Sequence, residues 1–166
     1  IETAAIDANI SDPLEVYLNS IQNVNWNSSM SAIIKAGSLT RGETRDADKV
    51  KTIHDYVVSD VRYDGNKFSH VTADYIPSID STLRSGSGIC YDYASLFGAM
   101  LRSVGVPAKL VKGYSSNAQG YHAWNEVYEG GRWVIIDTTY DAQMKDAGYS
   151  VSMIKSGSQY NKSKEY

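Results

Sequence analysis

Three side chains in this sequence are of the types that together perform nucleophilic catalysis: Cys90, which is the only cysteine, His122 and Asp137. A thiolate is a strong nucleophile, an imidazole exchanges protons near neutral pH, and a carboxylate can hold that imidazole in one orientation. Each also has a purely structural explanation. A lone cysteine is often a small buried hydrophobic residue, a histidine can be satisfied within a sheet, and Asp137 can cap the turn at Thr138-Thr139.

The sequence around Cys90 predicts the beginning of a helix. Apolar residues recur from Cys90 at steps of four and three, the spacing of one buried helical face. They are Cys90, Ala94, Phe97, Leu101 and Val104, and Gly105-Val106-Pro107 ends the helix. Unpaired backbone N–H groups and the helix dipole at this terminus favour a thiolate over a thiol. We expect Gly86 and Gly88, just before the helix, to let a substrate backbone approach Cys90.

A β-hairpin is predicted to bring His122 and Asp137 together. Strand-like segments span residues 108–114, 121–128 and 132–137, and their short connections favour antiparallel pairing. If Glu129-Gly130 is a two-residue turn, the two residues lie directly opposite each other; if Gly130-Gly131 is the turn, they are diagonal neighbours on one face. A three-residue turn without a bulge would place them on opposite faces. Either two-residue turn therefore predicts contact.

The other elements are predicted from hydrophobic spacing and helix-capping residues. A short helix is expected from the cap at Ser11 to residue 21, and a second one from residue 44 to about residue 60. Residues 31–36 fit a strand and a helical turn equally well. Residues 67–87 lack a sustained period, which predicts a long irregular connection. We expect residues 75–83 of this connection to form one wall of the cleft in which a substrate would reach Cys90. From residue 138 onward the sequence predicts only short pieces of secondary structure, and we expect the end of the chain from residue 156 to be frayed.

Composition excludes several classes of function. The chain has 166 residues, of which 42% are hydrophobic, the size of one domain with a substantial core. With a net charge of -3 and no basic cluster, the sequence lacks the electrostatic signature of nucleic-acid binding, and no apolar run approaches the about 18 residues of a membrane span. His54 and His70 have no partners at metal-ligand spacing, and no phosphate loop or dinucleotide motif occurs, so we predict neither a metal nor a cofactor.

Four ordered blocks of sequence resemble the transglutaminase-like superfamily of bacteria. They are residues 88–94, residues 101–108, residues 122–127, and residues 137–141 with Trp133 before them. The resemblance covers about residues 50 to 141. It implies an α+β, papain-like cysteine protease fold, in which the nucleophile helix packs on an antiparallel sheet. It also implies Cys90 as nucleophile, His122 as acid and base, and Asp137 as the residue that orients the imidazole.

The resemblance further implies an enzyme that acts on amide bonds of proteins or peptides, cell-wall peptides included, through a thioester intermediate. Water as the second nucleophile makes a peptidase or amidase, which we expect ahead of a cross-linking transglutaminase because a domain this small offers little surface for an amine substrate. The alternative from another class is a non-catalytic binding module of the cell envelope. The oxyanion of the tetrahedral intermediate needs hydrogen-bond donors, and we expect these to be the Cys90 backbone N–H and the hydroxyl of Tyr63. The presence of Tyr63 is explained equally well if its ring packs against the core.

Two expectations concern the chain as a whole. We expect one domain, in which residues 1–45 form an N-terminal helical extension packed on a catalytic core of residues 46–166. Because the chain begins at Ile1 without a methionine, and is rich in tyrosine, serine and asparagine, we expect an extracellular or cell-envelope protein from which an N-terminal signal has been removed.

Overall fold

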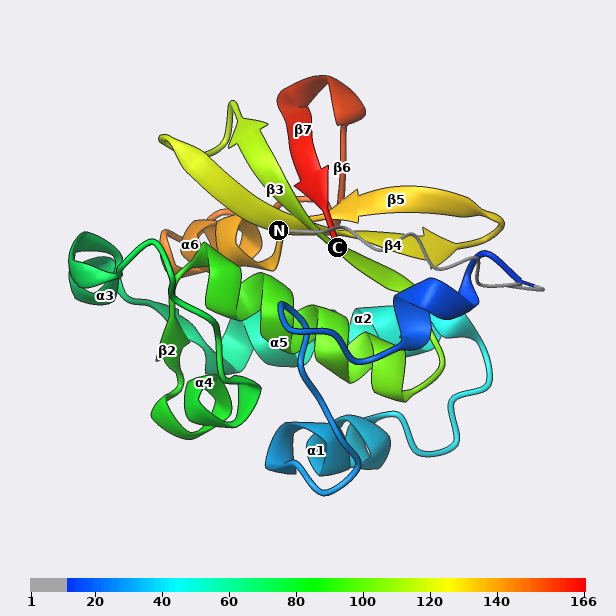
Figure 1. Cartoon of the computed structure of the whole chain (residues 1–166). Helices are drawn as coiled ribbons and strands as arrows, with labels where there is room; N and C mark the ends of the chain where they lie inside the picture. The colour runs from blue at the N-terminus through cyan, green and yellow to red at the C-terminus, as the bar shows by residue number, and fades with distance from the viewer. Residues whose placement is uncertain (1–11) are drawn as a thin grey trace, which may run out of the picture.

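The computed structural model describes residues 12–166 and contains a five-stranded antiparallel sheet (Figure 1). The predicted meander forms its middle, and two strands from the tail form its edges, in the order β6-β5-β4-β3-β7. The strands are β3 (Ala108–Ser115), β4 (Tyr121–Glu129), β5 (Arg132–Ile136), β6 (Ile154–Lys155) and β7 (Tyr160–Glu165). Together with the helices, this sheet confirms the predicted α+β class.

The helix α5 (Cys90–Ser103) lies between the sheet and two further helices, α1 (Ser31–Leu39) and α4 (Ile79–Ser85) (Figure 1). All of its residues from Cys90 to Arg102 are buried, because it is covered on every side. Asn125 of β4 fixes the helix to the sheet, since its side-chain amide donates to the carbonyl oxygens of Ala94 at 3.0 Å and Lys109 at 3.1 Å. The predicted helix is confirmed, with Cys90 as its first residue.

Four of the five remaining helices within residues 12–166 pack on α5, and two of the five lie in a predicted loop. The five are α1 (Ser31–Leu39), α2 (Asp46–Asp60), α3 (Gly65–His70), α4 (Ile79–Ser85) and α6 (Thr138–Asp146); all but α3 contact α5 extensively. The long irregular connection predicted over residues 67–87 is therefore wrong. Asp80 shows why the sequence pattern did not predict α4. Its carboxylate accepts the backbone N–H groups of Ser31 and Ala32, so this residue of α4 caps the N-terminus of α1, and the contact that holds α4 is distant in the sequence.

The N-terminal helix predicted over residues 11–21 is also wrong. One 3₁₀ turn, η1 (Glu15–Leu18), forms instead, and the cap assigned to Ser11 lies outside the described residues. The Asn19 side chain bonds back to the Glu15 carbonyl, and Ile21 exchanges both backbone hydrogen bonds with Val24, so the chain turns there rather than continuing as a helix. The predicted division of the chain at residue 45 stays a prediction.

The tail is ordered, contrary to the prediction of fragments and a frayed end. After α6 the chain forms β6, the 3₁₀ turn η2 (Gly157–Gln159) and β7, which pairs antiparallel with β3. In β7 every residue except Tyr160 is exposed. An edge strand rich in lysine, with little apolar alternation, protects the sheet from further pairing but gives no strand signal in the sequence.

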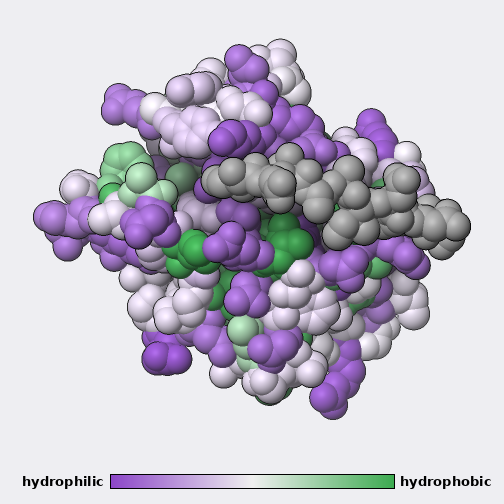
Figure 2. Space-filling view, in the orientation of Figure 1, coloured by the Kyte–Doolittle hydropathy of each residue, from purple (hydrophilic) through white to green (hydrophobic). Residues whose placement is uncertain are grey.

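The surface is largely polar on the face shown in Figure 2, with hydrophobic patches near its centre and at its left edge. Within residues 12–166, no helix has both the length and the apolar character needed to cross a membrane.

Candidate active site

Cys90 lies at the N-terminus of α5, with 9% of its surface exposed. A short parallel pair, β1 (Arg62–Tyr63) with β2 (Ser87–Gly88), fixes the loop before it and places Tyr63 opposite Gly88. Gly86 begins this loop at a φ of 60°, a left-handed conformation that favours glycine. The sequence of this loop thus determines where the thiol lies.

Asp92, in the first turn of α5, anchors the same loop from inside. Its fully buried carboxylate accepts the backbone N–H of Ile89 at 2.8 Å, and it also contacts the ammonium group of Lys67 at 2.7 Å and the hydroxyl of Tyr75. A Cβ atom at Gly88 would lie 2.6 Å from the Cβ of Asp92. The contact with Asp92 therefore requires a glycine here, and the expectation that Gly86 and Gly88 let a substrate backbone approach Cys90 stays a prediction.

The hairpin brings His122 and Asp137 into direct contact. Gly130 and Gly131 form the turn, both with positive φ, and Glu129 pairs with Arg132. This is the second of the two predicted registers, in which the residues are diagonal neighbours on one face. The Nε2 atom of His122 lies 2.8 Å from Oδ2 of Asp137, and both side chains are buried.

The carboxylate of Asp137 is held by three partners. Its Oδ1 atom accepts the backbone N–H of Tyr140 at 3.1 Å and so caps α6, while Oδ2 accepts the hydroxyl of Tyr160 at 2.9 Å in addition to its contact with His122. The same carboxylate therefore caps α6 and contacts His122. Sequence reasoning missed Tyr160, because it lies in the tail and nothing local in the sequence signals a contact with Asp137.

Charge around His122 favours its protonated form. Burial by itself would lower the pKa of this imidazole, but the hydrogen bonds to Asp137 and Cys90, together with the charges of both, raise it to about 10. Since Nε2 is engaged by Asp137, Nδ1 is the nitrogen that remains for the thiol. Trp124 stacks on the ring with centroids 6.2 Å apart, and it contacts Tyr160 in turn. These contacts fix the plane of the imidazole.

Cys90 and His122 open into one cavity with a volume of about 370 Å³. Tyr63 and Phe68 line it beside Cys90, and burial followed by the nearby charge of Cys90 raises the pKa of the Tyr63 hydroxyl. The rest of the lining is Asn117, Ala118, Gln119, Tyr121, Thr139, Tyr140 and Gln143. The predicted cleft wall at residues 75–83 is therefore wrong: the loop 117–119 and α6 supply that wall.

The other two histidines make local contacts elsewhere. His54 bridges α2 and α6 through Asp141, with Nε2 and Oδ2 2.9 Å apart, and His70 bonds to the Asn66 carbonyl oxygen at 2.8 Å. In the part of the chain that the structure describes, no group of three or more histidine, cysteine, aspartate or glutamate residues is arranged to hold a metal ion.

A cysteine at the N-terminus of a buried helix, packed on an antiparallel sheet that presents histidine and aspartate, is the arrangement of the papain-like cysteine protease fold. The chain belongs to the transglutaminase-like superfamily, whose family model matches residues 35–138. The resemblance read from the sequence is thereby confirmed.

Similar proteins of known sequence or structure agree with this family. The kyphoscoliosis peptidase of Mus musculus is 31% identical over 112 residues, which is 61% of this chain and 17% of that protein. The uncharacterized protein YebA of Bacillus subtilis (strain 168) is 32% identical over 126 residues, 61% of this chain and 16% of that protein. The match thus spans only a small part of these relatives.

Two solved structures share the fold. A candidate cysteine protease from Cytophaga hutchinsonii superposes with a TM-score of 0.65 at 24% identity, over 79% of this chain and 43% of that chain. The periplasmic domain of TgpA from Pseudomonas aeruginosa superposes with a TM-score of 0.57 at 23% identity, over 74% of this chain and 48% of that chain.

Proposed function

We propose that this domain is a cysteine-nucleophile enzyme that acts on amide bonds of proteins or peptides through a thioester intermediate. The observation that carries the proposal is the pairing of His122 with Asp137 at 2.8 Å, beside a cysteine at a helix N-terminus. A histidine needed only for packing would not require a buried carboxylate and a neighbouring thiol. Family membership supports the same chemistry.

In the first half of the reaction, the Cys90 thiolate attacks the amide carbonyl carbon and a carbon–sulfur bond forms. The His122 imidazolium, which Asp137 stabilises, gives its Nδ1 proton to the departing amine as the carbon–nitrogen bond breaks. The raised pKa of His122 keeps this proton available at neutral pH. The products of this half are a free amine and a thioester on Cys90.

In the second half, a new nucleophile cleaves the thioester. Neutral His122 takes a proton from water, the hydroxide oxygen bonds to the acyl carbon, and Cys90 leaves as a thiolate, which gives hydrolysis. A lysine-type amine in place of water gives an isopeptide bond. We place hydrolysis first because one cavity opens beside Cys90 and His122, and it must accommodate the substrate as well as any acceptor.

We assign two groups to stabilise the oxyanion of the tetrahedral intermediate. The Cys90 backbone N–H belongs to the first turn of α5, where backbone donors lack partners within the helix. The Tyr63 hydroxyl lines the same cavity, and we assign it as the second donor. A raised pKa keeps this phenol protonated and able to donate.

We also propose that the domain works outside the cytoplasm, in the cell envelope or beyond it. Its likeness to a periplasmic domain supports this placement. Fractionation of cells that express the natural full-length protein tests it, and recovery in the cytosolic fraction alone would contradict it.

Thiol labelling tests the enzyme proposal without a known substrate. We expect iodoacetamide to alkylate Cys90 at pH 6.5 at least about tenfold faster than in His122→Ala, because the imidazolium stabilises the thiolate. Equal rates in both proteins would instead support a non-catalytic binding module.

A glutamine-containing peptide library, incubated with and without a labelled amine, then separates hydrolysis from transfer. New peptide termini without incorporated label indicate hydrolysis, and label that is lost in Cys90→Ala indicates transfer.

A further inference from the structure

We propose that the cavity beside Cys90 is a binding site for an uncharged aromatic or large apolar side chain of the substrate. The inference rests on the proposed function, because it takes Cys90 as the reacting atom and names the substrate group that lies next to the scissile amide. It goes beyond that function, since the same nucleophile, acid and orienting carboxylate would serve a substrate with any side chain.

The lining of the cavity carries no net charge. Although the chain contains 16 lysine and arginine and 19 aspartate and glutamate residues, none of them is among the residues that line this cavity in the described part of the chain. Within the lining, the thiolate of Cys90 and the imidazolium of His122 that the proposed mechanism uses carry opposite charges, which offset each other. A charged substrate group would therefore lose hydration on entering and gain no opposite charge in return.

Four aromatic residues line the cavity, and they come from separate elements. Tyr63 and Phe68 form a tilted pair with centroids 6.5 Å apart, and Tyr121 and Tyr140 contribute from β4 and α6. Tyr121 is extended outward by Tyr114, with centroids 5.5 Å apart at 71°. Aromatic rings at a cavity wall can pack against the ring of a ligand as aromatic side chains pack against one another.

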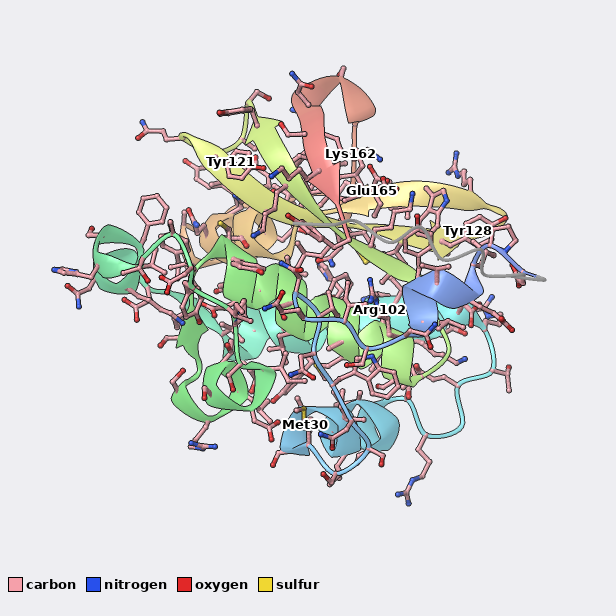
Figure 3. The ribbon with its side chains drawn as sticks, viewed as in Figure 1. Met30, Arg102, Tyr121, Tyr128, Lys162 and Glu165 are labelled. Carbon is pink, nitrogen blue, oxygen red and sulfur yellow. The ribbon has the colours of Figure 1, made fainter. Side chains whose placement is uncertain are left out.

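Two of these rings are about half exposed at the rim of the cavity. Phe68 is 48% exposed and Tyr121 is 45% exposed. Phe68 is the only large apolar side chain of α3, and a hydrophobic patch lies over α3 at the left edge of Figure 2. Figure 3 shows Tyr121 at the same end of the molecule as α3. Exposed aromatic rings around a concave site are typical of a binding surface.

The cavity has the size and the polar groups that this ligand needs. Its volume of about 370 Å³ accommodates one aromatic side chain and part of a peptide backbone. Gln119 and Gln143 offer neutral amides that can bond to backbone N–H and C=O groups. Neutral hydrogen-bonding groups around aromatic rings fit a peptide with an uncharged side chain, and no feature of the lining selects a carboxylate or an ammonium group.

Four chloroacetamides, of which two are neutral, one is anionic and one is cationic, test the pocket directly. In each case the Cys90 sulfur displaces chloride, so that a carbon–sulfur bond forms as the carbon–chlorine bond breaks. The reagents are 2-chloroacetamide as reference, its N-benzyl derivative, the anionic chloroacetylglycine and the cationic N-(2-aminoethyl) derivative. Each rate, followed by mass spectrometry of the intact protein, is divided by the rate with glutathione. We expect the benzyl reagent to exceed the reference about tenfold, and neither charged reagent to exceed it.

Variants at the rim assign the preference to the cavity. Phe68→Ser should bring the ratio of the benzyl rate to the reference rate close to one, and Phe68→Asp should turn the preference toward the aminoethyl reagent. Tyr149→Ser, at an aromatic residue that is 66% exposed and outside the cavity lining, should change neither. A charged reagent that matches or exceeds the benzyl one overturns the inference, as does a benzyl advantage that persists in Phe68→Ser combined with Tyr121→Ser.

Failure of the proposed function gives a different result. If Cys90 is not activated, the reference reagent reacts equally fast with the natural protein and with His122→Ala. The ratio between reagents reports the pocket alone, and is read separately from that comparison.

Discussion

Asp137 controls the protonation of His122, and its replacement tests this at the scale of single residues. In the folded protein, burial opposes the imidazolium, and the bonds and charges of Asp137 and Cys90 outweigh burial to raise the pKa of His122 to about 10. The raised pKa stabilises the fold fully below the ordinary value of 6.5, and this contribution is lost as the pH rises through about 10. Asp137→Asn should therefore lower the pKa of His122.

Nitrogen-15 NMR of the histidine rings from pH 5 to pH 11 measures this change. In the natural protein the His122 ring should stay protonated well above neutral pH, and in Asp137→Asn it should lose its proton at a lower pH. The ring signals of the exposed His70, which lies outside this contact, serve as the internal reference. An unchanged His122 titration in the variant would show that Asp137 does not stabilise the imidazolium.

Tyr160 is predicted to position Asp137 for this role. Tyr160→Phe removes only the hydroxyl that donates to Oδ2 of Asp137 and keeps the ring against Trp124. The substitution removes one hydrogen bond to the buried carboxylate and also the acceptor of the Asn117 side-chain amide at 3.2 Å. We expect alkylation of Cys90 at pH 6.5 to slow by about tenfold, with little change in thermal stability. The matched control is Tyr128→Phe, at a tyrosine that packs on Trp133 away from Tyr121 in Figure 3. Equal losses in the two variants would contradict a specific role for Tyr160.

At the scale of elements, the loop and first turn of α5 depend on the buried carboxylate of Asp92. Asp92→Ala leaves the Ile89 N–H and the Lys67 ammonium without their acceptor, so we expect the free energy of unfolding to fall by about 3 kcal/mol. Asp92→Asn keeps an acceptor for Ile89 and should lose less. Asp48→Ala, in an exposed pair with Arg45, should change stability little.

Urea denaturation compares these variants, and thiol labelling of each shows whether the loop still presents Cys90. A stability of Asp92→Ala equal to that of Asp48→Ala would mean that the loop does not depend on this carboxylate.

Elements with a local signal could be predicted from the sequence, and elements fixed by distant contacts could not. The spacing of apolar residues after Cys90 predicted α5, and Gly130-Gly131 restricted the hairpin to registers in which His122 meets Asp137. In contrast, α4 depends on the contact of Asp80 with α1, and β7 is a polar edge strand. Tyr160 was missed for the same reason, because a strand without apolar alternation carries it to Asp137.

At the scale of the whole molecule, Arg102 joins segments that are far apart in the chain. Figure 3 shows it on α5, and its guanidinium donates to the carbonyl oxygens of Asn19 at 2.7 Å, Ala108 at 2.8 Å and Tyr166 at 3.0 Å. It is 2% exposed, and burial lowers its pKa to about 10. The segment before α1, the first residue of β3 and the end of β7 therefore share one buried cation.

Replacing Arg102 should loosen all three segments at once. In Arg102→Met the side chain still fills space, but three carbonyl oxygens lose the guanidinium as a donor, and that of Tyr166 keeps another, the backbone N–H of Leu110. The free energy of unfolding should therefore fall by about 3 kcal/mol. Hydrogen exchange should rise most around Asn19 and in β7, because these segments are held to α5 by Arg102. Arg62→Met, in an exposed pair with Asp146, is the matched control and should cost less than about 1 kcal/mol. Because β7 carries Tyr160 to Asp137, Arg102→Met should also slow alkylation of Cys90. A loss of stability with an unchanged alkylation rate would show that the contacts of Arg102 do not help to position the active site.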